Sequence, residues 1–115
     1  MNIIRLAVPT KGDKGLEDSV SDVFGRSERF VILEISDGSV VNVKVVENPA
    51  ASYKHGAGPI VVKMLSDMGV TAVAAREFGP GVSTLLEQNG IKRFNVEASI
   101  SVKEAVQKVL QELGL

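Results

Sequence analysis

The residues best suited to chemistry in this sequence form the Gly-rich segment His55-Gly56-Ala57-Gly58-Pro59. Its histidine is the only one in the chain, and imidazole can bind copper or iron. Glycine reaches backbone angles closed to other residues, and Pro59 is preset for the first position of a helix, so the segment predicts a helix N-terminus. Such an end carries unpaired N–H groups and a partial positive charge, which favours a bound anion. A second start of this kind occurs at Gly79-Pro80-Gly81.

Candidate ligand-binding residues lie in three segments that the expected topology brings to one edge of a sheet. They are basic residues, glycines and one phenylalanine: Lys11, Lys14, Arg26, Lys54, His55, Gly56, Gly58, Arg76, Phe78, Gly79 and Gly81. For the glycines, ligand contact and the shaping of a turn both remain open, although Gly81, unfavourable inside a helix, is expected to permit close approach. The alternative for Arg26 is an ion pair with Asp22 or Glu28. For His55, the only candidate metal ligand, the alternative is a hydrogen bond to backbone.

Apolar patterning predicts the elements that position these residues. Strands are expected at 3–8, 29–35, 40–46, 70–75 and 91–96, with a tight hairpin turn at Asp37-Gly38. Helices are expected over 60–68, from residue 82 to a stop at Gly90, and after a capping box formed by Ser101 and Glu104.

The element order β-β-β-α-β-α-β-α predicts a single α/β domain over residues 1–115. We expect a ribonuclease-H-like three-layer fold, in which a five-stranded mixed sheet of order 3-2-1-4-5, with strand 2 antiparallel, has helices on both faces. The loops 10–28, 47–58 and 76–81 then converge at one edge. Ligands of open α/β sheets bind outside the carboxyl ends of the strands, so this edge is the expected site.

Composition narrows the function further. The chain has no cysteine, which excludes disulfides, thiolate zinc sites and cysteine-ligated iron–sulfur clusters. A formal charge of −1 and few aromatic residues argue against nucleic-acid binding. No apolar run suggests a membrane span or a signal peptide, so a cytoplasmic location is expected.

Catalysis is not expected, and no residue is assigned a catalytic role. The sequence offers no Ser-His-Asp set, no carboxylate pair near His55 and no Walker-type lysine after the glycines. The first expected strand carries no carboxylate, which argues against two-metal nuclease chemistry.

Three motifs resemble the dinitrogenase iron–molybdenum cofactor biosynthesis family. They are Ser21-Asp22-Val23-Phe24-Gly25-Arg26 followed by Phe30, then Glu47-Asn48-Pro49, and then the segment from His55 to Pro59. The family includes NifX-like nitrogenase cofactor carriers, the C-terminal domain of NifB, and stand-alone proteins similar to the Orange protein. The resemblance spans nearly the whole chain and implies the ribonuclease-H-like fold. One departure is Arg76-Glu77-Phe78-Gly79-Pro80, where many members read Gly-Gly-Ile-Gly-Pro. The bulkier, charged pair Arg76-Glu77 would narrow the site or change its charge.

This resemblance implies a non-enzymatic carrier or assembly protein for a molybdenum-containing sulfide cluster of the iron–molybdenum or molybdenum–copper type. The cluster would be bound non-covalently, and the protein would receive it from donor proteins and pass it to acceptor proteins. We expect the protein to be a monomer or weak dimer that contacts neither nucleic acid nor membrane. The alternative is a module that binds a small anion or a nucleotide phosphate through the same helix N-termini and holds no metal cluster.

Overall fold

Five strands form one mixed sheet in the computed structural model, which describes residues 3–115. The strands are β1 (Ile3–Thr10), β2 (Arg29–Ser36), β3 (Ser39–Glu47), β4 (Ala72–Ala75) and β5 (Lys92–Asn95). The helices are α1 (Ala57–Asp67), α2 (Val82–Gln88) and α3 (Val102–Leu113), with a short 3-10 helix, η1 (Gly15–Glu17), in a loop where no helix was predicted.

The strand order is β3-β2-β1-β4-β5, which confirms the predicted order. β2 is antiparallel to both β1 and β3, whereas β1, β4 and β5 run parallel. Thr10 pairs with Arg29, and Arg29 pairs with Glu47, so the end of β1, the start of β2 and the end of β3 lie side by side. This alignment brings the loops that follow β1 and β3 and precede β2 to one end of the sheet.

The hairpin between β2 and β3 turns at Asp37 and Gly38, as predicted. Both residues have positive φ, 51° and 83°. Two consecutive positive φ values are typical of the tight turn whose twist matches that of the flanking strands, and Asp-Gly is a favoured pair for it.

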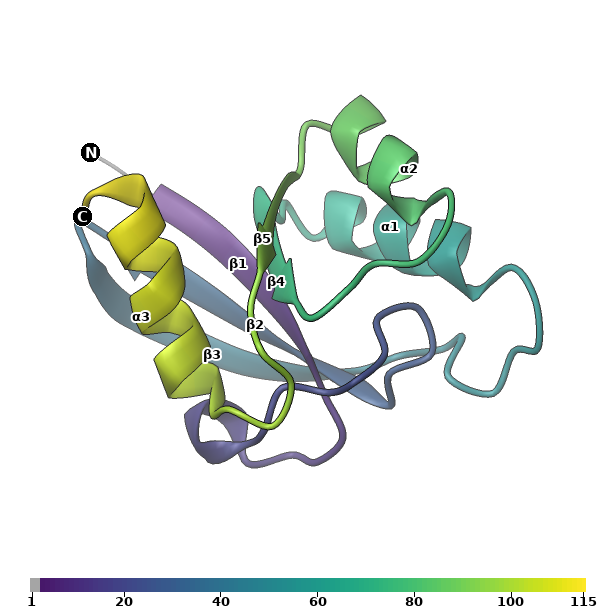
Figure 1. Ribbon diagram of the computed structural model, residues 1–115, viewed down its shortest axis with the longest axis horizontal. Coiled ribbons are helices and arrows are strands. Elements are labelled where there is room, and N and C mark those ends of the chain that lie inside the picture. Colours follow the sequence, from purple (N-terminus) through teal and green to yellow (C-terminus); the bar gives the residue numbers. More distant parts are fainter. Residues whose placement is uncertain (1–2) are drawn as a thin grey trace.

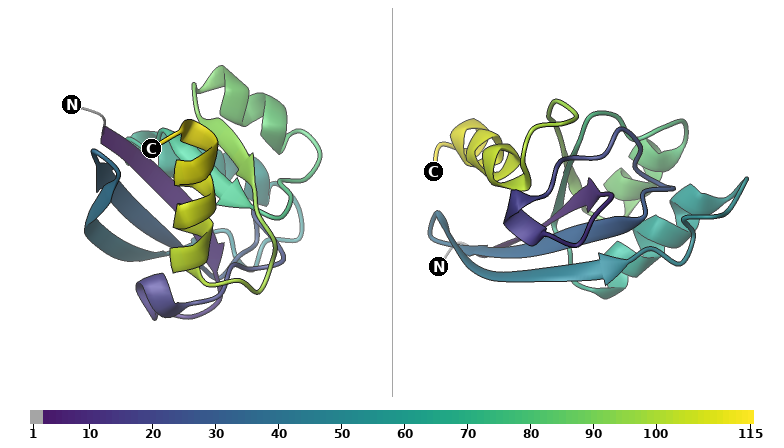
Figure 2. Two further views of the ribbon diagram at one scale, coloured as in Figure 1. Left: turned by 60° about the vertical axis from the view of Figure 1, so that its left-hand side comes forward. Right: turned by 90° about the horizontal axis from the view of Figure 1, so that it is seen from below.

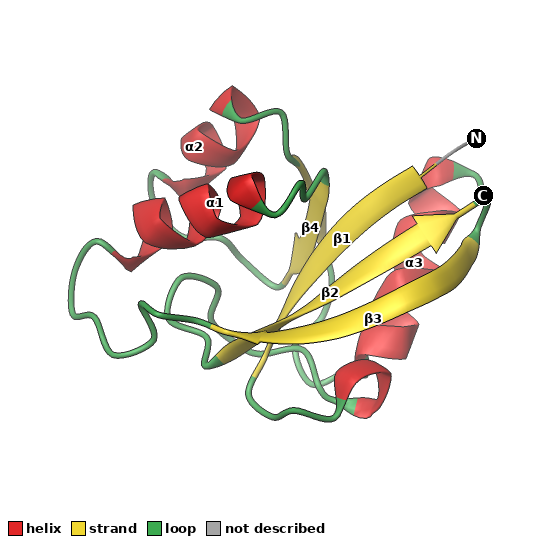
Figure 3. Cartoon of the chain, turned by 180° about the vertical axis from the view of Figure 1, so that it is seen from behind, coloured by secondary structure: helices red, strands yellow, loops and turns green. Residues whose placement is uncertain are grey.

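Alternation along β1 divides its side chains between two cores. Leu6 and Val8 face the core shared with α3, whereas Ala7 faces the core shared with α1 and α2. The ribbon views show α3 on one side of the sheet and α1 with α2 on the other (Figures 1, 2 and 3). The expected three-layer arrangement with helices on both faces is therefore present. Within residues 3–115, no helix is both long and apolar enough to traverse a bilayer.

The start of α1 differs from the prediction. The helix begins at Ala57, after Gly56 at the N-cap with φ of 76°, so Pro59 is its third residue and not its first. Proline is tolerated there because N–H groups in the first helical turn have no partner within the helix. Similarly, Pro80 lies before the N-cap of α2, which is Gly81.

Ser101 caps α3 as predicted, and removing this cap has a measurable cost. The second half of the predicted capping box, a bond from the Ser101 N–H to the Glu104 carboxylate, is absent among the described residues, because that carboxylate accepts from the Ser101 hydroxyl at 3.4 Å instead. The Ser101 hydroxyl accepts a hydrogen bond from the Glu104 N–H at 3.1 Å. We expect Ser101→Ala to lower the free energy of unfolding by about 1 kcal/mol, because one N–H of the first turn loses its partner. Urea denaturation checks this. Ser101→Thr keeps the oxygen and should retain most of the stability; equal losses in both variants would contradict the capping role.

Candidate functional site

Three loops at one end of the sheet line a cavity of about 310 Å³. The loops supply residues 23–26, which precede β2, residues 54–58, which lead into α1, and residues 77–80, which follow β4. Figure 1 shows these segments near the start of α1. The convergence predicted from the topology is therefore present, and the cavity size lies at the small end of the range for small-molecule sites.

Seven of the eleven candidate residues line this cavity: Arg26, Lys54, His55, Gly56, Gly58, Phe78 and Gly79. The other four lie outside its lining. Lys11 borders a different cavity with Asp18 and Asp22, and Lys14 precedes η1. Arg76 is exposed at the end of β4, where its carbonyl accepts a hydrogen bond from Asn95. Gly81 is the N-cap of α2.

Positive charge predominates around the cavity. The Arg26, Lys54 and His55 side chains are exposed, and Glu77 is the carboxylate on the same lining. Two permanent cations and one carboxylate leave a formal excess of one positive charge before His55 is counted. Within residues 3–115, neither Arg26 nor Lys54 forms a salt bridge, so the alternative pairing of Arg26 with Asp22 or Glu28 is absent. Both cations remain available to an anionic ligand.

Backbone N–H groups add to this positive potential. α1 starts in the cavity wall, and no side chain caps its first turn. The start of α3, in contrast, is capped by Ser101. An anion in the cavity would therefore approach the positive end of α1 without competition from a capping side chain.

Aromatic rings form the apolar part of the cavity wall. Phe24 packs edge-on against Phe30 and Phe78, with ring centroids 5.3 and 5.2 Å apart. All three rings are buried. Closely packed side chains hold their positions, so this wall is a firm apolar surface beneath an exposed, charged rim.

The four candidate glycines have two different structural roles. Gly56, Gly79 and Gly81 have positive φ, and a Cβ on any of them would meet open space. The backbone conformation at Gly81 is itself a reason for glycine, which is the N-cap of α2 and not a residue inside it; contact of Gly81 with a ligand stays a prediction. Gly58 has no positive φ, but a Cβ on it would lie 2.6 Å from Cγ2 of Val82. It allows α1 and α2 to touch.

Sequence reasoning missed three residues that shape the site. Phe24 and Gly25 line the cavity but were quoted only as parts of a motif. Asn48 is buried beneath the loops, with 6% of its surface exposed. The signal for Asn48 was a polar amide between a strand end and a proline, which is typical of a residue that binds backbone.

The described residues contain no preformed metal-ion site. Residues 3–115 hold no group of three or more His, Cys, Asp and Glu side chains placed to bind a metal ion. His55 could therefore contribute a single bond to a metal centre that brings its other ligands with it.

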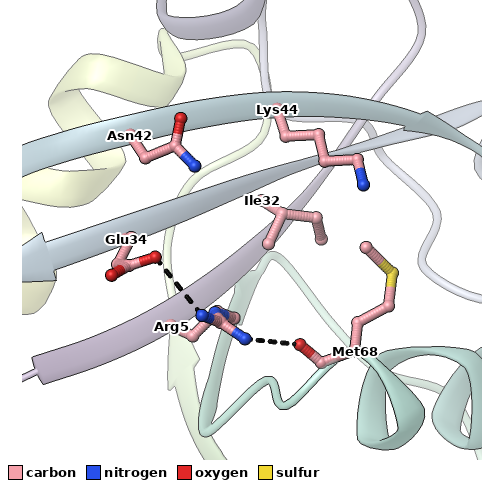
Figure 4. Close-up of a pocket in the computed structure, with 6 residues that line it drawn as sticks. All are labelled: Arg5, Ile32, Glu34, Asn42, Lys44 and Met68. Atoms are coloured by element: carbon pink, nitrogen blue, oxygen red, sulfur yellow. Dashed lines mark hydrogen bonds and ion pairs between the residues drawn. The ribbon is translucent and has the colours of Figure 1, made fainter.

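A second cavity, of about 230 Å³, lies beside the end of α1, on the face of the sheet that packs against α1 and α2 (Figure 4). Arg5 dominates it, donating to the Met68 carbonyl at 2.9 Å and pairing with Glu34 at 3.3 Å. A cation bound to the last carbonyls of a helix stabilises the helix end. Arg5 thus serves the junction of α1 with the sheet, and its guanidinium is already occupied.

Known proteins share this architecture over almost the whole chain. The apo orange protein from Desulfovibrio gigas superposes with a TM-score of 0.84 at 28% identity, covering 96% of this chain and 90% of that one. A Thermotoga protein proposed to be a NifB protein superposes with a TM-score of 0.76 at 35% identity, covering 94% and 88%. An uncharacterized protein of Methanocaldococcus jannaschii is 28% identical over 111 residues, covering 96% of this chain and 89% of its own.

The sequence profile of the dinitrogenase iron-molybdenum cofactor family matches residues 2–112. The match includes all three loops of the cavity. This chain therefore belongs to the dinitrogenase iron-molybdenum cofactor family.

Proposed function

We propose that this protein is a non-enzymatic carrier that holds a molybdenum-containing sulfide cluster as cargo in the cavity formed by residues 23–26, 54–58 and 77–80. The observation that carries the proposal is the grouping of Arg26, Lys54 and His55 around the uncapped start of α1. Membership in the cofactor family and the similarity to the orange protein support it.

The chemistry of the lining suits a sulfide-rich polyanion. Since the chain has no cysteine, the cluster must bring its own sulfides. Arg26 and Lys54 would balance its charge, N–H groups at the start of α1 would donate to its outer atoms, and the Phe24 and Phe78 rings would contact its polarisable surface. His55 would supply one bond to copper or iron.

Carriage is favoured over catalysis by what the lining contains. Its thirteen residues include no serine, threonine or cysteine nucleophile, and we assign Lys54 and His55, which could also act as nucleophiles, to holding the cargo. We propose the ribonuclease-H-like class for the fold, which the strand order and the antiparallel β2 support. With it we propose a cytoplasmic monomer or weak dimer as the working form. The partners we propose are proteins that deliver and receive the cluster, with neither nucleic acid nor membrane involved.

Anaerobic titration of the apo-protein with tetrathiomolybdate tests this function. The titration is done with and without copper, and is followed by desalting and metal analysis. We expect stoichiometric molybdenum to stay with the protein and a new visible absorption band to appear. Loss of all molybdenum on desalting, combined with saturable binding of inorganic phosphate or a nucleotide, would overturn the proposal in favour of a simple anion-binding module.

His55 provides a sharper prediction for the copper-containing cluster. We expect His55→Ala to shift the visible band of the bound cluster, because one metal atom loses its imidazole ligand. The exposed position of His55 means that folding should be unaffected. Ser52→Ala, an exposed change in the same loop, is the control and should leave the band unchanged. An identical spectrum in His55→Ala and the unaltered protein would remove His55 from the set of ligands.

A further inference from the structure

Buried polar side chains gather at the cavity end of the sheet. Among residues 3–115, the buried polar or charged residues are Thr10, Ser21, Ser27 and Asn48. Burying a polar group is costly unless it is hydrogen-bonded, and no buried side-chain nitrogen or oxygen among the described residues lacks a partner. Beneath the loops these side chains therefore form hydrogen bonds that an apolar side chain could not form.

Asn48 makes the most connections of this group. Its amide nitrogen donates to the Gly25 carbonyl at 2.9 Å and to the Ser27 carbonyl at 2.8 Å. Its amide oxygen accepts from the Ala50 N–H at 2.9 Å. The Ser27 hydroxyl in turn donates to the Thr10 carbonyl at 2.8 Å. One amide thus ties the segment before β2 to the segment after β3, and Ser27 extends the tie to the end of β1.

The tie reaches the cavity through Gly25. A Cβ on Gly25 would lie 3.3 Å from the nitrogen of Gly58, so these two backbones are in near contact. Gly25 and Gly58 are both in the cavity lining. The position of the Gly25 peptide, which Asn48 holds by its carbonyl, therefore bears directly on the start of α1.

We propose that Asn48 is a positioning residue, which touches no ligand itself but fixes residues 23–26 against residues 54–58 and so sets the spacing of the cations and N–H groups around the cavity. The effect of this positioning on cluster binding rests on the proposed function. Only an amide fits the role, because two donors are needed toward carbonyl oxygens and one acceptor toward an N–H.

Asn48→Asp is the discriminating variant. It keeps the size of the side chain and the acceptor for Ala50, but it removes both donors and places oxygen against the carbonyls of Gly25 and Ser27. Val109→Ala is the matched control, since it weakens the core on the opposite face of the sheet without touching the loops. Both full-length variants are studied below their melting temperatures, by amide NMR without ligand and by titration with tetrathiomolybdate and copper.

We expect Asn48→Asp to shift the amide signals of residues 24–27 and 50–58 and to leave those of α3 in place. Retention of tetrathiomolybdate should weaken by about tenfold, which corresponds to the loss of one or two hydrogen bonds that hold the loops. Val109→Ala should lower the melting temperature and leave retention unchanged. Unmoved loop signals in Asn48→Asp would overturn the proposal, as would equal losses of retention in both variants.

The two readouts separate this inference from the proposed function. If the unaltered protein retains no tetrathiomolybdate, the carrier function fails, and the ligand-free amide signals alone decide whether Asn48 positions the loops. If the unaltered protein retains the cluster and Asn48→Asp retains it equally well, the carrier function stands and the positioning role fails.

Discussion

Replacing Gly58 with valine is expected to lower the free energy of unfolding by about 3 kcal/mol, the cost of overpacking a close contact between two elements. Even a Cβ at this position would lie 2.6 Å from Cγ2 of Val82, and valine adds two further carbons. Val82 is buried in the first turn of α2, and a β-branched side chain in a helix has one strongly preferred rotamer, so it cannot swing away. Chemical denaturation of the purified variants measures the loss.

Two further variants show whether the contact with Val82 is the cause. Trimming the partner in Gly58→Val/Val82→Ala should recover part of the loss, which gives a non-additive double-mutant cycle. Gly56→Ala adds a Cβ two residues earlier, where nothing lies within 4 Å, and should cost only about 1 kcal/mol for a non-glycine residue at positive φ. A Gly58→Val variant as stable as the unaltered protein would show that α1 and α2 do not touch in this way.

Most of the fold could be predicted because its determinants are local. The Asp37-Gly38 turn fixes the hairpin, the Ser101 cap fixes the start of α3, and continuous apolar runs mark the buried strands. Two helical crossovers then make β3, β4 and β5 parallel, which leaves few ways to order the sheet. The observed strand order is the one that follows when the first strand is parallel to the third, as it is here.

The parts of the site that were not predicted depend on contacts between distant segments. Gly58 was a candidate for ligand contact because its neighbours form a Gly-rich loop, yet its tight neighbour is Val82, 24 positions away in the sequence. Asn48 binds carbonyls more than 20 residues earlier in the chain. The sequence indicates that Asn48 binds backbone but does not identify its partners, and it gives no sign of the contact between Gly58 and Val82. In both cases the two partners come from segments that only the folded chain brings together.

The basic residues show the same limit of sequence reasoning, because two of the predicted candidates lie outside the cavity. Lys11 and Lys14 were grouped with Arg26 because all three follow β1 and precede β2. The 3-10 helix η1 and the hydrogen bond from the Lys14 N–H to Asp18 divide that long loop into two parts. Only the second part, near Phe24, reaches the cavity. The charge of the site is thus smaller than the sequence suggested, and it is concentrated on two cations.

Removing those two cations should abolish most of the binding. For the double variant Arg26→Gln/Lys54→Gln we expect tetrathiomolybdate retention to fall by about a hundredfold, since each charge-assisted contact accounts for roughly a factor of ten. Stability should change little, because both side chains are exposed and neither forms a salt bridge within residues 3–115. Equilibrium dialysis at low ionic strength measures the affinity, and thermal melting checks the fold.

A matched variant separates local contacts from the net charge of the molecule. Arg93→Gln/Lys103→Gln removes the same total charge from exposed positions on β5 and α3, outside the cavity lining. If the anion is held by contacts in the cavity, this control should bind almost normally, and the difference between the two double variants should narrow as salt screens the exposed cations. Equal losses of affinity in both double variants would mean that binding depends only on the net charge of the protein, and the cavity would then not be the binding site.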